Sequence, residues 1–286
     1  MFSAETLQGK HIVVTGGGSG LGLEMARGFL SVGASVSLIG RNRARLEQAL
    51  KDLGGDGTRV LLHPCDVRSY EEVQNTFSSI VEHTGRVDGV VNNAAGNFYC
   101  ASEDLTSNGF RTVVDIVLQG TFNWSQVFGS YLIEHSLPGS ILNIVATYSH
   151  FGSAFVLPSA CAKAGVHALT QTLGVEWAHH GIRVNAVAPG PFPTEGAWSR
   201  LIPDEKIEQR YKRLLPTRRF GEKSELANLA IFLLSDLSPY ITGECIYIDG
   251  GEHLRGGSFN FLLEYFEPED LKKMFRGLKS KSQAQK

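Results

Sequence analysis

The sequence predicts an α/β fold, a single doubly wound parallel sheet with helices on both of its faces. Short apolar runs rich in β-branched residues alternate with helix-period segments from the start of the chain to about residue 250. The runs are apolar throughout, which is typical of parallel strands buried on both faces. No internal repeat and no Pro/Gly-rich linker divides the 286 residues, and this length suits one such domain.

Each expected element follows from its local pattern. Strands are expected at residues 11–15, 34–39, 60–63, 87–91, 140–145, 183–187 and 245–248. A helix at 21–30 and a charged helix ending at residue 53 separate the first three strands, and helices between parallel strands imply right-handed crossovers. We therefore expect one sheet domain over residues 1–255.

The composition changes after residue 255. Residues 259–263 are apolar, residues 268–278 have the pattern of a short charged helix, and residues 279–286 are polar. We expect this C-terminal extension, residues 256–286, to pack on the domain and to end in a disordered tip.

Composition excludes several kinds of partner. The net charge is −2 and 20% of the residues are charged, so no global basic field indicates nucleic acid or a membrane surface. No stretch approaches the ~20 apolar residues of a membrane-spanning helix. His150, His179 and His180 have no acid or cysteine partner at metal-binding spacing, so we expect no metal. The cysteines lack the spacing of a redox or metal motif; they are Cys65, Cys100, Cys161 and Cys245.

The cysteines and the first residues bear on the compartment. We expect the cysteines to be reduced, which favours a reducing compartment. The first residues show neither a secretory signal nor an Arg-rich transit peptide. We expect the cytoplasm for a bacterial protein, and the mitochondrial or peroxisomal matrix for a eukaryotic one.

A Gly-rich turn joins the first expected strand to the first expected helix. Residues 15–22 read Thr-Gly-Gly-Gly-Ser-Gly-Leu-Gly. Glycines here let the backbone turn tightly and approach a pyrophosphate, which rests on the N-terminus of the helix. The setting between strand and helix makes the signal much stronger than a Gly-rich run alone. The expected cofactor contacts are Thr15, Gly16, Gly18, Ser19, Gly20, Leu21 and Gly22.

The end of the second strand indicates which dinucleotide binds. An enzyme that uses NAD commonly has an acid here, which holds the ribose 2′-hydroxyl. This chain has Arg41 and no acid, and a guanidinium can pair with a 2′-phosphate. NADP(H) is therefore favoured. Arg43 can equally well begin a solvated helix.

Polar and turn-forming residues follow three further strands at their carboxyl ends, where such sheets bind ligands. They are Asp66 and Val67, then Asn93 and Ala95, then Pro189, Gly190 and Pro191. Together with the turn at 15–22, these elements resemble those of the short-chain dehydrogenase/reductase family. The resemblance implies a Rossmann-like fold, and contacts from these residues to adenine, to the cofactor's middle and to nicotinamide.

The catalytic positions depart from the usual pattern of that family. Its members carry an Asn, a Ser, and a Tyr four residues before a Lys. Here Lys163 is present, but the other positions hold Val117, Ala146 and Ser159. A serine hydroxyl titrates far above the roughly 10 of a phenol, so it is a poor proton donor near neutral pH. A new polar set, comprising Asn97, Tyr148 and Ser159, accompanies Lys163.

This set is similar to the one in 2,4-dienoyl-CoA reductases, a branch of the family that uses NADPH. The supporting segments are residues 93–98, 115–121, 147–148, 158–166, 189–191, 196–200, 249–251 and 257–260. The resemblance implies reduction of a 2,4-dienoyl-CoA to a 3-enoyl-CoA in the β-oxidation of unsaturated fatty acids. Gln119, where the family often has Asn, is a departure for which we expect no catalytic consequence.

The same resemblance implies a role for each site residue. Tyr148 and Asn97 would hold the thioester oxygen, Lys163 the nicotinamide ribose, and Ser159 the cofactor or Lys163. Phe98 and Thr106 would lie near the acyl chain and pantetheine of an acyl-CoA substrate. The residues expected near the CoA phosphates are Arg41, Arg68 and Arg200.

Alternatives remain open. A 2-enoyl-CoA reductase or a carbonyl reductase could use Tyr148 as its acid, and a cofactor-binding pseudoenzyme would explain the lost tyrosine. The resemblance further implies a homotetramer, because short-chain dehydrogenases commonly pair through the two helices beside the site. Residues 110–128 and the Lys163 helix carry enough apolar residues for such a face.

Overall fold

The strands of the described chain form one parallel, seven-stranded sheet in the order β3-β2-β1-β4-β5-β6-β7. The structure is a computed structural model that describes residues 2–55, 58–194, 198, 202 and 204–284. The strands are β1 His11–Thr15, β2 Ser35–Gly40, β3 Val60–Pro64, β4 Gly89–Asn92, β5 Gly139–Ile144, β6 Ile182–Pro189 and β7 Cys245–Ile248. The order reverses between β1 and β4, so the predicted doubly wound fold is confirmed.

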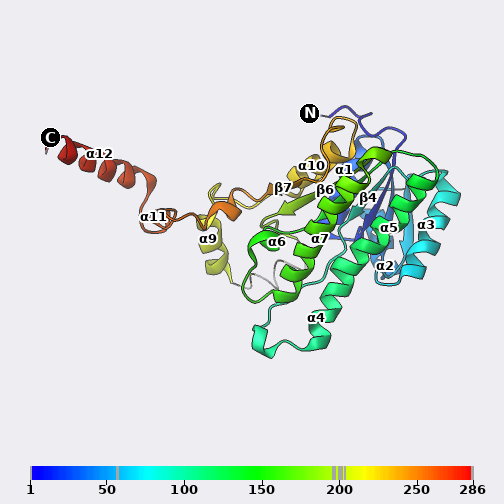
Figure 1. Ribbon diagram of the computed structural model, residues 1–286, viewed down its shortest axis with the longest axis horizontal. Coiled ribbons are helices and arrows are strands. Elements are labelled where there is room, and N and C mark those ends of the chain that lie inside the picture. The colour runs from blue at the N-terminus through cyan, green and yellow to red at the C-terminus, as the bar shows by residue number, and fades with distance from the viewer. Residues whose placement is uncertain (1, 56–57, 195–197, 199–201, 203, 285–286) are drawn as a thin grey trace.

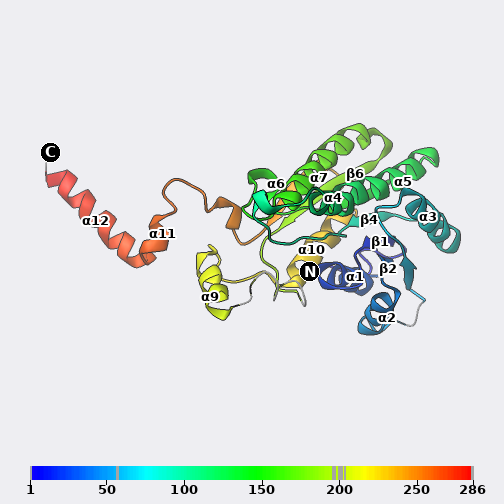
Figure 2. The ribbon, with the colours of Figure 1, turned by 90° about the horizontal axis from the view of Figure 1, so that it is seen from below.

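Helices cover both faces of the sheet (Figure 2). One face carries α1 Gly20–Ser31, α2 Arg43–Asp52 and α10 Lys223–Leu234, and the other carries α3 Tyr70–Thr84, α5 Gly120–Glu134 and α7 Leu157–Glu176. The shorter α4 Ser107–Val114 leads into α5 through a π-helical segment, Asp115–Gln119. Further helices are α6 Tyr148–Phe151, α9 Glu205–Leu214, α11 Leu262–Tyr265 and α12 Pro268–Ala284.

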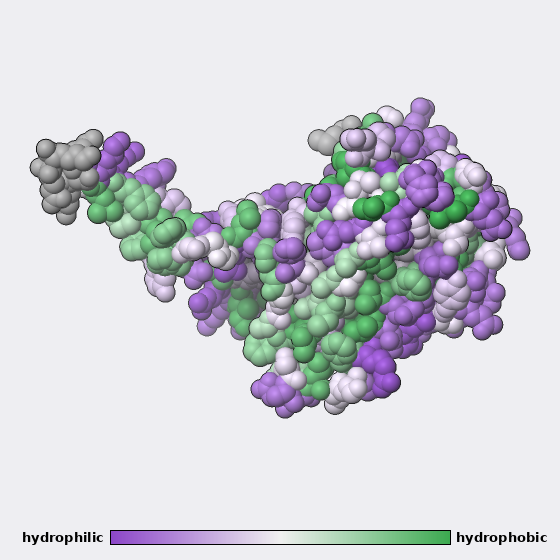
Figure 3. All heavy atoms as spheres, in the orientation of Figure 1, coloured by the Kyte–Doolittle hydropathy of each residue, from purple (hydrophilic) through white to green (hydrophobic). Residues whose placement is uncertain are grey.

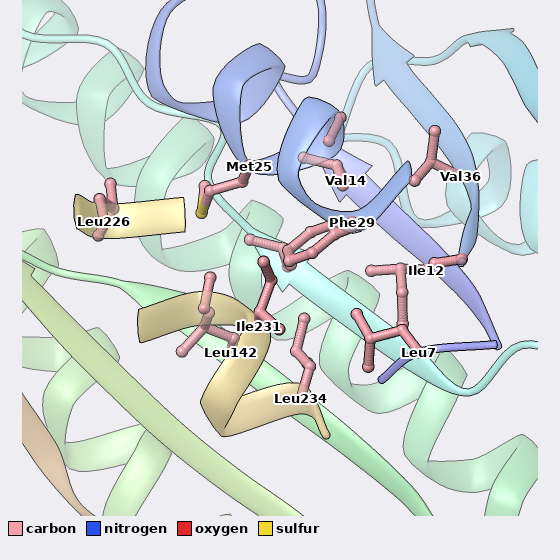
Figure 4. Close-up of a cluster of buried hydrophobic side chains, with 14 of the residues drawn as sticks. Leu7, Ile12, Val14, Met25, Phe29, Val36, Leu142, Leu226, Ile231 and Leu234 are labelled. Atoms are coloured by element: carbon pink, nitrogen blue, oxygen red, sulfur yellow. The ribbon is translucent and has the colours of Figure 1, made fainter. Parts of the chain in front are cut away.

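The largest buried cluster lies between the sheet and the pair α1 and α10 (Figure 4). Phe29 of α1 is fully buried at its centre, among side chains of β1 and α10. The two helices approach closely because Gly28 has no side chain; a Cβ there would lie 3.1 Å from that of Ala227. This packing holds the first turn of α1 at the carboxyl edge of the sheet.

Buried amides join the strands beneath the site. Asn92, at the end of β4, donates to the side-chain oxygen of Asn143 in β5 over 2.9 Å. Asn143 in turn donates to the hydroxyl of Thr170 in α7 over 2.9 Å. Asn143 and Thr170 are fully buried. Because a buried amide without a partner is costly, this chain of hydrogen bonds fixes α7 relative to the two central strands.

The C-terminal arm, which we define as residues 256–284, projects away from the sheet domain (Figures 1 and 2). Within one copy of the chain, the expectation that the arm packs on the sheet domain is therefore wrong. Its aromatic side chains stay exposed, and ion pairs at its root join Arg255 to Glu264 and Arg218 to Glu267. The polar segment was expected to be a disordered tip. In the structure α12 continues through it beyond residue 278, as far as Ala284.

The described residues offer neither a membrane-spanning helix nor a cluster of metal-binding side chains. None of their helices is long and apolar enough to cross a membrane. No group of three or more His, Cys, Asp or Glu side chains within the same part of the chain could share a metal ion.

Candidate active site

The Gly-rich turn is held against the loop after β4. The Thr15 hydroxyl donates to the Val91 carbonyl at 3.2 Å and accepts from the N–H groups of Asn93 and Ala94, at 2.9 and 3.0 Å. The Asn93 amide donates back to the Thr15 and Gly16 carbonyls, at 3.0 and 3.3 Å. Thr15 and Asn93 therefore join two binding loops, a role that the local sequence did not reveal.

This joint accounts for two of the glycines. Gly16 has a φ of 63°, in the left-handed region that favours glycine. A Cβ at Gly22 would lie only 2.6 Å from the Asn93 amide nitrogen and 2.6 Å from the Gly16 carbonyl oxygen. Any side chain at position 22 would thus push the turn away from the loop after β4.

The N-terminus of α1 is suited to an anion. Ser19 is exposed, and its side chain makes no capping hydrogen bond to the first turn. The first N–H groups of a helix lack partners inside the helix, and the helix dipole favours negative charge there. The glycine turn and this uncapped terminus together fit the pyrophosphate of a dinucleotide.

Charged side chains beyond β2 and β3 surround the expected adenosine end. Arg41 is exposed and makes no ion pair within the described chain, whereas Arg43 pairs with Glu47 of its own helix at 3.0 Å. Asp66 and Arg68 pair with each other, with a closest distance of 2.6 Å. Hydrogen bonds from Arg68 hold the pKa of the Asp66 carboxyl below its usual value. Among these described side chains, Arg41 is thus the cation available to a ligand.

The loop after β6 is packed tightly against β7. The Gly190 N–H donates to the Ile248 carbonyl at 3.1 Å, and a Cβ at Gly190 would lie 2.6 Å from that of Asp249. The Pro191 carbonyl accepts from the Gly221 N–H at 3.0 Å. Pro189, Gly190 and Pro191 therefore form a rigid wall at the expected nicotinamide end.

Tyr148 and Ser159 meet at the catalytic end. Their hydroxyl oxygens are 3.0 Å apart, with Tyr148 at the start of α6 and Ser159 near the start of α7. Ser159 is 2% exposed, and Tyr148 is partly buried. The resemblance implied the cofactor or Lys163 as the partner of Ser159; its partner in the structure is Tyr148.

Lys163 lies one helical turn after Ser159 and is buried. Its ammonium donates to the Ile144 carbonyl at the end of β5, and burial lowers its pKa to about 8. Burial also raises the pKa of Tyr148, an effect that the hydrogen bond with Ser159 opposes. Tyr148 is thus a neutral hydrogen-bond donor near neutral pH, beside a lysine that gives up its proton more readily than usual.

Asn97 lies in the exposed loop after β4. Its side-chain oxygen accepts from the Phe98 N–H at 2.9 Å, while its amide nitrogen has no hydrogen-bond partner within the described residues. No hydrogen bond joins Asn97 to Tyr148 there, but the neighbouring Tyr99 is close enough to raise the pKa of Tyr148. The loop of Asn97 therefore borders the site, with a free donor on it.

The expected substrate contacts lie around this loop. Phe98 is 39% exposed, whereas the Thr106 hydroxyl caps α4 by accepting from the Gly109 N–H at 3.0 Å. Arg200 lies outside the described residues. The other expected cofactor contacts differ in exposure: Val67 is buried, Leu21 is half-buried and Ala95 is exposed.

Three further side chains, Asn123, Tyr211 and Glu252, support the site and were missed. Gln119 donates to Asn123 at 2.8 Å, and Asn123 donates to the Val67 carbonyl at 2.8 Å. Tyr211 of α9 donates to Glu252, which follows β7. A polar residue within an apolar helix is a sequence signal that could have pointed to Asn123. The Tyr211–Glu252 pair left no such signal, because its members are 41 residues apart.

Comparison with known proteins decides the family. Residues 16–253 match the family model described as enoyl-(acyl carrier protein) reductase. A short-chain dehydrogenase from Bacillus anthracis has a similar solved structure, with a TM-score of 0.82 and 42% identity over 88% of this chain and 99% of that one. The chain belongs to the short-chain dehydrogenase/reductase family. It is therefore an oxidoreductase that binds a nicotinamide dinucleotide, and other solved relatives hold NAD⁺ or NADP.

Several curated members of this family with similar sequences are named 2,4-dienoyl-CoA reductases. A probable (2E)-enoyl-CoA-producing enzyme from Bacillus subtilis is 43% identical over 87% of this chain and 98% of its own length. A probable (3E)-enoyl-CoA-producing enzyme from Caenorhabditis elegans is 39% identical over 97% of this chain and 93% of its own length. The resemblance drawn from the sequence is thus confirmed.

Proposed function

We propose that the protein uses NADPH to reduce 2,4-dienoyl-CoA thioesters to 3-enoyl-CoA in the β-oxidation of unsaturated fatty acids. The observation that carries this proposal is the Tyr148–Ser159 hydroxyl pair beside buried Lys163. The phenol of this pair comes from the start of α6, after β5, instead of standing four residues before the lysine. The names of the curated relatives give the substrate class.

The position of the phenol suits charge that develops away from the reacting carbon. A nicotinamide cofactor, when bound, would supply the hydride for the remote end of the diene, which leaves negative charge on the thioester oxygen. The Tyr148 hydroxyl donates a hydrogen bond to that oxygen. The Ser159 hydroxyl in turn donates a hydrogen bond to the Tyr148 oxygen and so orients the phenol. Asn97 contributes its free amide as a second donor. Donors aimed at developing charge are often the largest catalytic contribution.

Lys163 would bind the ribose hydroxyls of the nicotinamide cofactor, and its hydrogen bond to the Ile144 carbonyl holds its ammonium in place. Because its pKa is lowered, Lys163 would pass a proton toward Tyr148 more readily than an ordinary lysine. The α carbon of the substrate then takes a proton from water or from Tyr148, and the double bond stays between carbons 3 and 4. Protonation at the γ carbon would instead give the 2-enoyl product after which the Bacillus subtilis relative is named.

The preference for NADPH rests on Arg41. It is exposed, free of ion pairs within the described chain, and next to the expected adenosine ribose. A guanidinium forms bidentate hydrogen bonds to a phosphate. We assign the CoA phosphates to Arg41, Arg68 and Arg200, with Arg68 exchanging one of its bonds to Asp66 for the ligand.

We also propose a homotetramer built through the helices beside the site. Exposed apolar side chains lie along these helices, among them Phe122 of α5 and Val175 of α7, and the face of α4, α5 and α7 is rich in apolar residues (Figure 3). A single species of about 31 kDa by light scattering would reject this assembly.

One assay tests the function. The purified protein is given NADPH and 2,4-hexadienoyl-CoA, NADPH absorbance is followed, and the product is identified by mass and NMR. We expect NADPH to be consumed and 3-hexenoyl-CoA to form. Reduction of 2-hexenoyl-CoA to a saturated product, or reduction of ketones alone, would point to another member of the family. No turnover despite NADPH binding would point to a pseudoenzyme.

A further inference from the structure

The C-terminal arm leaves large apolar side chains without cover. Phe259 is 77% exposed and Tyr265 is 76% exposed. Phe261, Leu263, Phe266, Met274, Phe275 and Leu278 are also exposed. The arm projects from the body in two perpendicular views (Figures 1 and 2). A solvated arm would not be expected to carry so many apolar residues, so this one is shaped to bind a surface.

Helix α12 has an apolar stripe and a basic remainder. Leu271, Met274, Phe275 and Leu278 follow the spacing i, i+3, i+4 and i+7, which places them on one face. The intervening cations are Lys272, Lys273, Arg276 and Lys279. Acids occur only in its first turn, where Glu269 pairs with Lys272 and Asp270 with Lys273. The stripe is thus flanked by positive charge along most of the helix.

The charge of the chain is strongly segregated. Residues 271–286 contain six Lys or Arg and no Asp or Glu. Residues 256–270 add four acids and no Lys or Arg, so the basic charge of the arm lies in α12. Residues 1–255 contain 21 Lys or Arg and 25 Asp or Glu, a net charge of −4. The basic helix α12 is therefore attracted to the acidic body of another copy. An anionic bilayer would attract α12 but repel the acidic body, which disfavours a membrane as the occupant.

The body has a surface that matches the arm. We call it the aromatic rim, made of Phe98, Tyr99, Phe151, Phe155 and Leu157, which are 39% to 65% exposed. A hydrogen bond of 2.9 Å from the Cys100 N–H to the Phe155 carbonyl joins its two loops. Exposed Glu103 and Asp104 follow directly, and residues 87–110 and 139–162 contain no Lys or Arg. The rim is thus apolar and acidic, whereas helix α12 of the arm is apolar and basic.

The contacts at the arm's root direct it outward. Glu252 accepts from Tyr211 of α9, and buried Asp249 accepts from the His253 ring at 2.8 Å. Arg218, ahead of α10, pairs with Glu267 at 3.4 Å, just before α12 begins. These bonds fix the start of the arm at the carboxyl edge of the sheet, with α12 beyond α9 (Figure 2). The rim of the same copy is left uncovered.

We propose that the C-terminal arm of one copy docks across the aromatic rim of a second copy, which returns the same contact. The rim borders Tyr148 and the Asn97 loop, so the partner's arm completes the wall of the neighbouring site. That this wall covers a bound acyl chain rests on the proposed function; the docking itself does not.

Photo-crosslinking tests the docking without any assay of activity. A photoreactive phenylalanine derivative replaces Phe275 in the full chain, and isotope-labelled and unlabelled copies are mixed before illumination. We expect links from position 275 to residues 97–104 or 151–157 of the other copy. The same group in place of fully exposed Tyr240 serves as the control and should not link to the rim. Links within one chain, or none to the rim, would overturn the proposal.

Kinetics test the contribution to the site. Phe275→Asp should raise KM for a long-chain dienoyl-CoA about tenfold and leave KM for 2,4-hexadienoyl-CoA nearly unchanged, because only the long chain reaches the arm. Mixing this variant with the inactive Tyr148→Phe variant, whose arm is intact, should lower KM again. An unchanged long-chain KM would refute the shared wall. A third outcome would assign the arm to a membrane instead. In that case the full chain binds phosphatidylserine vesicles, Phe275→Asp abolishes this binding, and no crosslinks to the rim form.

Discussion

The Tyr148 hydroxyl lies 3.0 Å from that of Ser159, which is buried one turn before Lys163 on α7. The serine therefore occupies the place of the family's usual phenol, while a phenol from α6 reaches it from the side. In this arrangement the serine orients the donor and the tyrosine meets the substrate. The two hydroxyls should accordingly differ in their effect on turnover.

We expect Tyr148→Phe to lower kcat by roughly 10²–10³, because it removes a donor that acts on the developing oxyanion. NADPH affinity should stay nearly unchanged. Ser159→Ala should cost less, since Tyr148 can still donate. Adding Ser159→Tyr to Tyr148→Phe should not restore activity. Steady-state kinetics and NADPH titration check this; near-full activity of Tyr148→Phe with an inactive Ser159→Ala would reverse the assignment.

Asn97→Ala should lower kcat within the same range of roughly 10²–10³, because its free amide is the second donor to the oxyanion. The Tyr148→Phe and Asn97→Ala double variant should lose less than the sum of the two free-energy changes, since both groups serve one oxygen. A double-mutant cycle on kcat measures the coupling. Strict additivity would show that the two side chains act on separate groups.

Arg41 should set the cofactor preference. We expect KM for NADPH to be lower than that for NADH by about tenfold or more, since a charge-assisted bidentate contact is lost without the 2′-phosphate. Arg41→Asp should weaken NADPH binding and narrow this difference. Arg43→Asp is the matched control, because Arg43 pairs with Glu47 in its own helix. Equal use of both cofactors by the unchanged protein contradicts this assignment.

Lys163 should make stability depend on pH. Its pKa is about 8 in the folded protein, against 10.5 for an ordinary solvated lysine, so between these values the unfolded chain binds more protons. The contribution of Lys163 to the free energy of unfolding therefore rises from pH 8 to 10.5. Below pH 8 the cost of burying the charge is fully present. Urea unfolding at several pH values should show this rise in the unmodified protein relative to Lys163→Met; parallel curves would contradict it.

Local patterns were sufficient for much of the fold. The sequence predicts directly the strands at residues 11–15 and 245–248 and the turn at 15–22. Apolar runs and clustered glycines are properties of short segments, so no distant residue is needed to recognise them. The roles of Thr15 and Asn93 were harder to read. Both were assigned to the cofactor, yet their hydrogen bonds to each other depend on two loops 78 residues apart.

By itself, the sequence determined the α/β order, the dinucleotide turn, the loss of the usual tyrosine and the family to which the chain is similar. Tertiary structure alone decided which polar groups meet: Tyr148 with Ser159, Asn92 with Asn143, and Tyr211 with Glu252. It also decided that the C-terminal arm leaves the body. The physical reason is distance along the chain: backbone conformation follows from neighbouring residues, whereas hydrogen bonds, ion pairs and burial depend on which segments the folded sheet brings together.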